Sequence, residues 1–326
     1  MTKKIIGIGN AIVDILCKVQ DGFLHEHSLI KNSMSLIDDD TANKLSLLKP
    51  EKITCGGSVS NAIATLGQLG CKTSFIGKVG SDNFGTKFIS ELEKTGTQFI
   101  GESAYGRTSA KSFVMITPDA HRTMCTFLGC ASEINENDID DKNFKDAHYL
   151  YLEGYLWDRE ETISGLKKAI NLAKKDGLKI AFSLSDSFCV ARHKKDFLNL
   201  VINDLDIVFA NEHEALELIS RPDFSVEILG KTFAKNPNLT AIVTRSEKGC
   251  MIFDSGNLFE VAAKPVEKMV DTTGAGDAFA AGFFYGLVND FDLEKCGYFG
   301  NLLAAQIIQK FGARFEKEET LKLKLV

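Results

Sequence analysis

The sequence has 326 residues, of which 44% are hydrophobic and 25% are charged, and its formal net charge is −6. This composition is typical of a globular chain, and the length suits one large α/β domain with a sizeable core. An acidic chain without a basic block is not expected to bind nucleic acid or an anionic membrane. The longest apolar stretch, residues 278–288, is too short to span a bilayer, so we expect no membrane partner.

The eight cysteines form no CxxC pair, and no second pair of ligands at zinc spacing accompanies His25 and His27. Scattered cysteines in a chain of this length are typical of reduced thiols in a protein core, and not of a disulfide scaffold. We therefore expect a cytoplasmic protein without a structural zinc site.

Short β-rich runs alternate with runs of helical period over most of the chain. The predicted strands are 4–8, 73–76, 147–152, 179–183, 207–210 and 240–244, and the predicted helices are 58–69, 83–94 and 160–175. This alternation predicts a mostly parallel sheet covered by helices on both faces, which is a three-layer α/β/α arrangement.

Two stretches, 12–38 and 98–128, depart from this alternation because they hold β-type sequence with no good helix between. They predict a small β-sheet lid carried on the main domain. Because no linker or internal repeat divides the chain, we expect a single α/β domain over residues 1–326.

Two glycine motifs resemble known phosphate-binding loops but lack a required residue. Gly7-x-Gly9 follows the first strand, but Ile12 stands where a dinucleotide-binding fingerprint needs its third glycine. Gly230-Lys231-Thr232 resembles the end of a P-loop, but Ser225 stands where the leading glycine belongs. We therefore assign neither motif to a phosphate site.

The segment 271–277, with the sequence DTTGAGD, is a better candidate for an anion site. It precedes AFAAGFFYGLV, which predicts a buried helix beginning near Gly276. Gly274 and Gly276 allow a tight turn and close approach to the backbone, and a helix N-terminus offers unpaired N–H donors. Asp277 has two interpretations here: a helix residue stabilised by the dipole, or a base that accepts the proton of an attacking hydroxyl group.

From about residue 4 to residue 315, the sequence resembles the PfkB/ribokinase family of carbohydrate and nucleoside kinases. DTTGAGDAFAAGF resembles the C-terminal signature of that family, and the run from Gly56 to Gly70 resembles its N-terminal signature. The shorter matches are Gly80-x-Asp82-x-x-Gly85, Asn211-Glu212-His213-Glu214, the nucleotide-loop region Thr244 to Gly249, and Gly312-Ala313.

The resemblance implies a ribokinase-like fold and an enzyme that transfers the γ-phosphate of ATP to a hydroxymethyl group. Asp277 would then be the catalytic base, and Gly274, Ala275 and Gly276 would form the anion hole. Glu214, together with Asn211, would hold Mg²⁺ through water. The nucleotide would contact Asn211, Thr244, Ser246, Gly249, Gly274 and Gly276, although the family usually has glycine where Ser246 stands.

Substrate hydroxyl groups in the family are held by the first strand and the first motif, which here implies Asn10, Asp14, Gly56, Gly57 and Asn61. Asp14 lies in the otherwise apolar run GIGNAIVDIL, where a carboxylate needs a partner. The adenosine-kinase branch carries an arginine in a comparable lid strand. By that resemblance Arg122 is expected to approach the phosphates. A monovalent cation such as K⁺ near Asp271 and Thr273 is an optional feature of the family.

The substrate has three interpretations. The spacings Asn10 to Asp14 and Gly57 to Asn61 resemble adenosine kinases and favour the 5′-hydroxyl of adenosine or a related nucleoside. Thr273 is closer to the sugar-kinase form, so a free sugar, as in ribokinase or fructokinase, stays an alternative. A non-catalytic ligand-binding protein on the same fold is the third, and the intact Asp277 argues against it.

A nucleobase would need apolar or aromatic walls, for which the sequence offers Phe113, Phe127, Tyr155 and Trp157. The expected partner is thus a small-molecule nucleoside or sugar. Both a monomer and a homodimer agree with the sequence.

Overall fold

The computed structural model describes residues 3–31, 33–101, 103–119 and 121–320. A nine-stranded sheet runs through its centre, with the strand order β16-β15-β14-β13-β12-β11-β1-β5-β7. Every adjacent pair from β14 to β7 is parallel, whereas β15 is antiparallel to both of its neighbours. These strands are β1 (Lys4–Ile8), β5 (Lys72–Ile76), β7 (Thr97–Ile100), β11 (Tyr149–Glu153), β12 (Lys179–Ser183), β13 (Ile207–Asn211), β14 (Thr240–Thr244), β15 (Cys250–Asp254) and β16 (Asn257–Val261).

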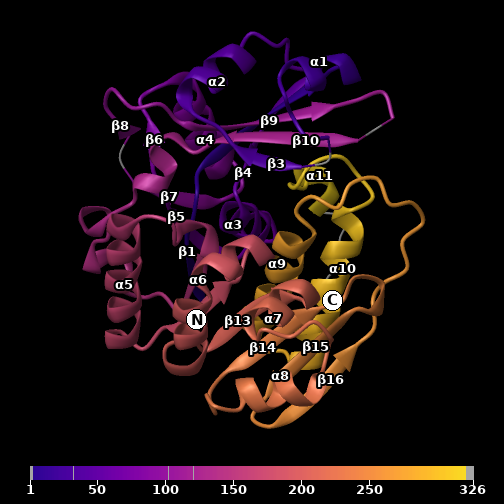
Figure 1. The fold of residues 1–326 in the computed structure, drawn as a ribbon. Helices are drawn as coiled ribbons and strands as arrows, with labels where there is room; N and C mark the ends of the chain where they lie inside the picture. The colour runs from indigo at the N-terminus through magenta and orange to yellow at the C-terminus, as the bar shows by residue number, and fades with distance from the viewer. Residues whose placement is uncertain (1–2, 32, 102, 120, 321–326) are drawn as a thin grey trace.

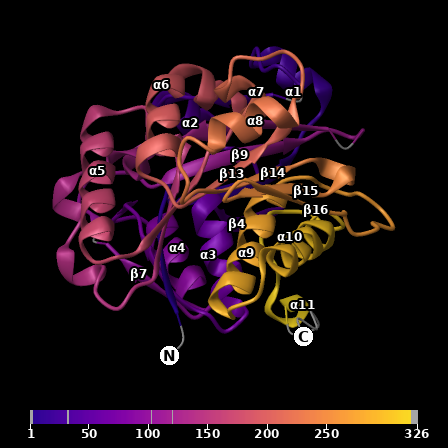
Figure 2. The same ribbon diagram turned by 90° about the horizontal axis from the view of Figure 1, so that it is seen from below.

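Helices cover both faces of this sheet, as Figure 2 shows from below. One layer contains α5 (Glu160–Lys175), α6 (Ser187–Asn203), α7 (Glu212–Leu218) and α8 (Val226–Phe233), and the other contains α3 (Ser58–Gln68), α4 (Asn83–Glu93), α9 (Ala275–Val288) and α10 (Leu293–Ile307). Alternation along a buried strand explains the two layers: Leu150 and Leu152 join the first core, while Tyr149 and Tyr151 join the second.

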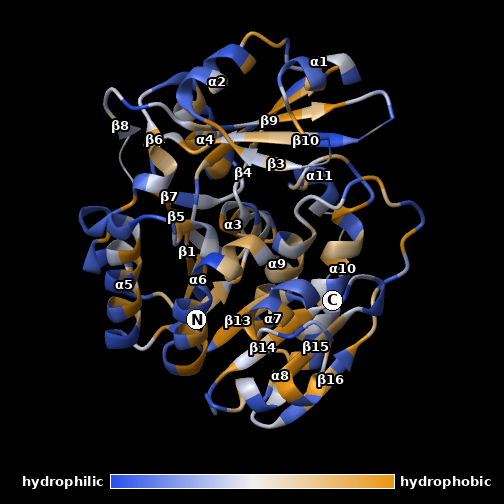
Figure 3. Cartoon of the chain, viewed as in Figure 1, coloured by the Kyte–Doolittle hydropathy of each residue, from blue (hydrophilic) through white to orange (hydrophobic). Residues whose placement is uncertain are grey.

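The three-layer arrangement and the mostly parallel sheet expected from the sequence are confirmed. Each strand and helix predicted above lies within two residues of its observed bounds. Apolar residues concentrate in the central strands and on the inner sides of the helices (Figure 3). The β15–β16 hairpin was not predicted, because its two strands follow each other directly and do not share the alternation of strand and helix on which the prediction depended.

A second sheet of five strands, with the order β3-β10-β9-β2-β4, is set apart from the first (Figure 1). Its strands are β2 (Ile12–Lys18), β3 (Met34–Leu36), β4 (Lys52–Gly56), β9 (Ala110–Ile116) and β10 (Arg122–Phe127). Helices α1 (Asp21–Glu26) and α2 (Asp39–Leu45) lie on its outer side in Figure 1, over a small core that includes Phe113 and Cys125. This sheet draws on both segments expected in the lid, 12–38 and 98–128, and adds β4 from outside them. Strand β7, which overlaps the start of the segment 98–128, lies instead at the edge of the large sheet.

Several short elements remain in the described chain. Five of them are 3₁₀ helices, at Gly129–Glu133, Glu136–Asp138, Asp141–Asn143, Gly154–Leu156 and Ser246–Lys248. Strands β6 (Val79–Gly80) and β8 (Ser103–Ala104) pair with each other, and α11 (Lys317–Thr320) follows the last long helix. None of the helices in the described ranges combines the length and the apolar character that a membrane crossing requires. All eight cysteines are free.

Candidate functional site

The candidate base, Asp277, lies in the first turn of α9 and faces the N-terminus of α3. Ser58 Oγ donates to Asp277 Oδ1 at 2.7 Å, and Asn61 Nδ2 donates to Oδ2 at 2.9 Å. Burial raises the pKa of Asp277 to about 6, while these two hydrogen bonds and the charge of Arg314 oppose the rise. The carboxyl is therefore mostly ionised at neutral pH and still basic enough to accept a proton.

The turn before α9 exposes backbone donors beside this carboxylate. Gly274 precedes the helix with φ 77°, and a Cβ atom there would lie 2.6 Å from Ala313 Cβ, so the turn needs glycine. Gly276 is exposed, with nothing within 4 Å of the position of a Cβ atom. Among the described residues, the N–H groups of Gly276 and Asp277 have no backbone acceptor. The turn thus suits an anion, as a helix N-terminus does.

Asp14 projects from β2 toward the other predicted substrate residues. A Cβ atom on Gly56 would lie 2.4 Å from Asp14 Oδ2, and one on Gly57 would lie 2.1 Å from the carbonyl oxygen of Asn10. Burial raises the pKa of Asp14 to about 7, opposed by Arg314 and assisted by the charge of Asp277. Asn10, Asp14 and Asn61 therefore surround one small region next to Asp277.

Glu153, the last residue of β11, completes this region, although the sequence did not single it out. It is fully buried, its Oε1 accepts from Asn10 N (2.9 Å) and Nδ2 (2.8 Å), and its Oε2 accepts from Val59 N (2.9 Å). These bonds orient the Asn10 amide so that Oδ1, which is buried without a described partner, remains as an acceptor. An acid in the apolar run YLYLEGYL was the available signal, the same one that identified Asp14.

Arg122 extends from β10 of the second sheet to the segment before α9. Its guanidinium pairs with the Asp271 carboxylate, donates to Thr273 Oγ1 at 3.2 Å, and stacks 5.2 Å from the centre of the Phe311 ring. Burial opposes the ionisation of Asp271, but the hydrogen bonds from Arg122, Gly312 N and Thr273 together hold its pKa below the ordinary value. The second sheet thus touches the proposed anion turn through Arg122.

The predicted nucleotide residues lie at the ends of β13 and β14, which pair in parallel with Asn211 opposite Thr244. Asn211 and Glu214 form a capping box at the start of α7, and burial raises the pKa of Glu214 to about 7. Ser246 is exposed with φ 50°, which explains the usual glycine at that position. Gly249 has φ 84°, and a Cβ atom there would lie 2.0 Å from the Val261 carbonyl oxygen.

Tyr155 lies close enough to both Glu214 and Asp277 to interact electrostatically with each of them. Burial and then the charges of Asp186, Asp277 and Glu214 raise its pKa. Since β1, β11, β13 and β14 are parallel, the residues at their carboxyl ends share one edge of the sheet, where ligands of open α/β sheets bind. The predicted site residues therefore gather at one edge.

Two of the four predicted aromatic walls are not available for a ligand. Phe113 is buried in the core of the second sheet, and Trp157 is buried under α6. Phe127 and Tyr155 are only partly buried, and the Tyr155 hydroxyl donates to the Ser185 carbonyl oxygen at 3.2 Å.

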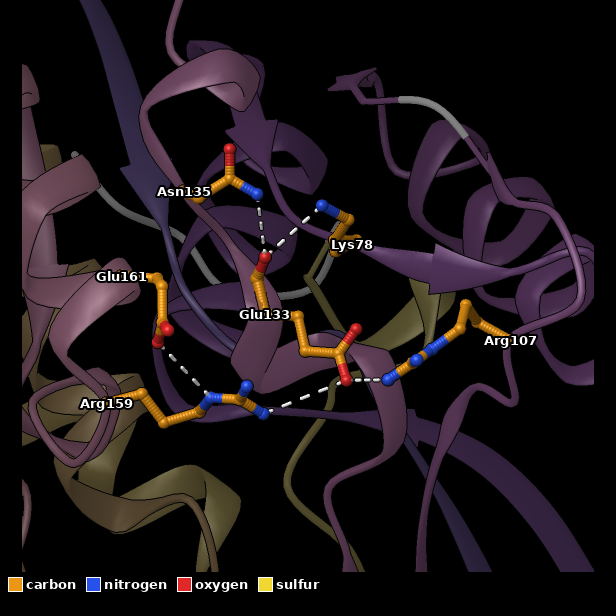
Figure 4. A pocket seen from close by; sticks show the side chains of 6 residues that line it. All are labelled: Lys78, Arg107, Glu133, Asn135, Arg159 and Glu161. Carbon is orange, nitrogen blue, oxygen red and sulfur yellow. Dashed lines mark hydrogen bonds and ion pairs between the residues drawn. The ribbon is translucent and has the colours of Figure 1, made fainter.

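A separate hollow of about 260 Å³ is lined by six polar side chains, Lys78, Arg107, Glu133, Asn135, Arg159 and Glu161 (Figure 4). Its charged side chains are paired with one another: Glu133 pairs with Arg107 and with Arg159, and Arg159 also lies 4.0 Å from Glu161. Lys78 donates to the Glu133 carbonyl oxygen at 3.2 Å and pairs with Asp138. Because these charged groups already have partners, we do not include this hollow in the candidate site.

A family model for the pfkB family of carbohydrate kinases matches residues 30–320. The chain belongs to the PfkB family. It is 37% identical to adenosine kinase from Sinorhizobium meliloti, over 97% of this chain and 96% of that one, with a TM-score of 0.88. It is 35% identical to a probable sugar kinase from Rhizobium etli CFN 42, over 100% and 99%, with a TM-score of 0.90. Adenosine kinase of Saccharomyces cerevisiae is 27% identical and is covered over 98% of both chains.

These comparisons confirm the predicted family and fold, and they show that the PfkB chain is a kinase of the sugar and nucleoside class. ATP as phosphate donor fits an ATP-dependent kinase family. Its similar structures carry both adenosine-kinase and sugar-kinase names, so they agree on the reaction class more closely than on the acceptor.

Proposed function

We propose that this PfkB kinase phosphorylates the 5′-hydroxyl of adenosine or a related nucleoside. The observation that carries the proposal is the pair of buried carboxylates, Asp14 beside Gly56 and Asp277 beside Asn61, which are close enough for the charge of Asp277 to raise the pKa of Asp14. One can accept hydrogen bonds from sugar hydroxyl groups, and the other, beside free N–H donors, can act as a base toward the attacking hydroxyl. The identity of 37% to an adenosine kinase favours a nucleoside acceptor.

The proposed mechanism assigns each residue a separate task. Asn10 Oδ1 and Asp14 hold the sugar hydroxyls, and Asp277 takes the proton of the reacting hydroxyl as its oxygen attacks. The N–H groups of Gly276 and Asp277 stabilise charge on the transferring group. Attack on the γ-phosphorus of ATP breaks its bond to the β-phosphate oxygen, and ADP leaves. Mg²⁺, held through water by Glu214 beside Asn211, would supply positive charge to the phosphates.

The described residues contain no cluster of three or more His, Cys, Asp or Glu side chains placed to hold a metal. Mg²⁺ usually keeps several of its waters and needs few direct protein ligands. We therefore assign Glu214 a contact through water, beside Asn211. A K⁺ site near Asp271 remains an optional part of the proposal.

The second sheet acts as a lid in this proposal, with Arg122 as its contact to the phosphates. Arg122 Nη2 is buried without a described partner and is therefore available to an anionic ligand. Closure of a lid would exclude water, which otherwise competes with the substrate hydroxyl as acceptor. We place the enzyme in the cytoplasm, where its free cysteines and its ATP supply are both maintained.

A free sugar is the second candidate, because Thr273 has the sugar-kinase form and only Phe127 and Tyr155 remain as aromatic walls. The deciding experiment measures ADP release with adenosine, inosine and guanosine against ribose and fructose. We expect turnover of at least one nucleoside and little turnover of the free sugars. Turnover of sugars alone would reject the nucleoside proposal in favour of the second candidate.

A further inference from the structure

The segment after α10 carries Arg314, a partly buried arginine that contacts the N-terminal signature. Its Nε donates to Asn61 Oδ1 at 2.9 Å, and its Nη2 donates to the Gly56 carbonyl oxygen at 3.3 Å and to Ser60 Oγ. The guanidinium carbon lies 5.7 Å from the centre of the Phe88 ring. Three hydrogen bonds and a ring contact therefore fix its plane.

This contact decides which end of the Asn61 amide faces the base. A guanidinium only donates, so the Asn61 atom next to it must be the carbonyl oxygen. The amide nitrogen then faces Asp277 and donates to Oδ2 at 2.9 Å. If the amide turned over, its NH₂ group would meet the guanidinium, and its oxygen would meet the Asp277 carboxylate.

Arg314 is also a positive charge near several acidic groups on different elements. Asp14 comes from β2, Asp277 from α9 and Glu91 from α4, and the Cys55 thiol comes from β4. Burial raises the pKa values of Asp14 and Asp277, and Arg314 opposes both shifts. Arg122 also lowers the pKa of Asp14, and Asp271 raises it.

We propose that Arg314 is a positioning residue of the phosphotransfer site, which fixes the Asn61 amide and supplies positive charge beside Asp14 and Asp277. This proposal rests on the proposed function. It assigns Arg314 no contact with the substrate, because its effect passes through Asn61 and through its charge.

The test compares Arg314→Met with Arg314→Lys, and uses Arg192→Met as the control. Arg192, on α6, pairs with Asp158, and neither residue is among the site residues named above. In a plot of kcat/KM against pH, activity declines on the acid side (the acid limb). In Arg314→Met we expect this acid limb to move to higher pH by about one unit, because a positive charge beside the carboxylates is lost, and we expect kcat to be about tenfold lower at neutral pH. In Arg314→Lys the charge remains, so the limb should stay while kcat falls, because lysine lacks the planar fork. The control should match the wild type.

Three results would overturn the proposal. One is an Arg314→Met enzyme whose acid limb coincides with the wild-type limb. Another is simple additivity of the Arg314→Met and Asn61→Ala losses in kcat/KM, since residues acting in one chain should not add. If Arg314→Met does not fold, Arg314→Lys decides, and a wild-type kcat in that variant overturns the role in fixing the amide.

A failure of the proposed function can be told apart from a failure of this inference. If the wild-type protein turned over no nucleoside and no sugar, the function would be wrong. The inference would then be decided by ¹³C NMR titration of the Asp277 carboxyl, assigned with Asp277→Asn. A higher Asp277 pKa in Arg314→Met together with an unchanged Asp277 pKa in Arg314→Lys supports it, and an unchanged Asp277 pKa in Arg314→Met overturns it.

Discussion

Replacement of Glu153 by glutamine should remove a large part of the pH dependence of folding stability. Glu153 is fully buried, and burial raises its pKa from 4.5 to about 7, against the opposing hydrogen bonds of Val59 and Asn10. Between these two values the folded protein binds more protons at this site than the unfolded chain does. The free energy of unfolding therefore falls as the pH rises through this window.

The size of the effect follows from the two pKa values. From pH 5 to pH 8, a carboxyl with a folded pKa of about 7 and an unfolded pKa of 4.5 lowers the free energy of unfolding by about 2.5 kcal/mol. Glutamine cannot ionise, so the Glu153→Gln protein should lose this contribution. Other buried carboxyls, such as Asp14 and Glu214, keep theirs in both proteins.

The assay is urea denaturation at pH 5 and pH 8, followed by the fluorescence of Trp157, the single tryptophan, which is buried. Glu93→Gln, at an exposed position of α4, is the control. The difference in unfolding free energy between the two pH values should be about 2.5 kcal/mol smaller for Glu153→Gln than for the wild type. An equal pH dependence in the two proteins would refute the reasoning that this carboxyl resists ionisation.

The remaining predictions concern the turn before α9 and its contacts. Asp277→Asn should lower kcat by about 10²- to 10⁴-fold, and a fully active Asp277→Asn enzyme would exclude Asp277 as the base. In the wild type, the rate of ADP release should decline at pH values below about 6, since burial raises the pKa of Asp277 to that value. Gly274→Ala should lower the melting temperature because of its φ of 77° and the contact with Ala313, whereas Gly276→Ala should melt like the wild type. Equal melting of both glycine variants would contradict this argument. Arg122→Gln should lower kcat by about tenfold or more with an unchanged fold by circular dichroism, as for a charge-assisted donor; full activity would remove Arg122 from the mechanism.

Much of the fold could be predicted from the sequence because parallel strands are buried on both faces. Runs such as Lys179–Ser183 are short and apolar, and the intervening helices have a clear period, so both element types are visible locally. The strand β4 was missed for the opposite reason. Its residues Lys52–Gly56 are half exposed at one edge of the second sheet, and their pairing with β2 is set by tertiary contacts.

The site residues also fall into two groups, those within contiguous sequence motifs and those that reach the motifs from distant parts of the chain. Asp277, Gly274 and Asn61 belong to motifs of contiguous residues, so the sequence alone identifies them. Glu153 and Arg314 act on those motifs from 94 and 253 residues away, through Val59 and Asn61 respectively. The acid in the apolar run YLYLEGYL is a local signal for Glu153, but it does not reveal the contacts with Val59 and Asn10, and no local pattern marks Arg314. Only the strand order of the sheet and the return of the chain after α10 bring them into contact.

The positive charges of the site have a consequence for how an acidic chain can bind a polyanion. Arg122 is already paired with Asp271, and Arg314 lies among Asp14, Asp277 and Glu91. Neither guanidinium therefore gives the region a net positive charge. In the proposed mechanism the attraction for a phosphate would come from the N–H groups at the start of α9 and from Mg²⁺, neither of which formal charge counts, with Arg122 Nη2 as a further donor. It follows that added salt should weaken nucleotide binding less than it would weaken binding to a cluster of exposed lysines, because donors held at contact distance are screened less than separated charges.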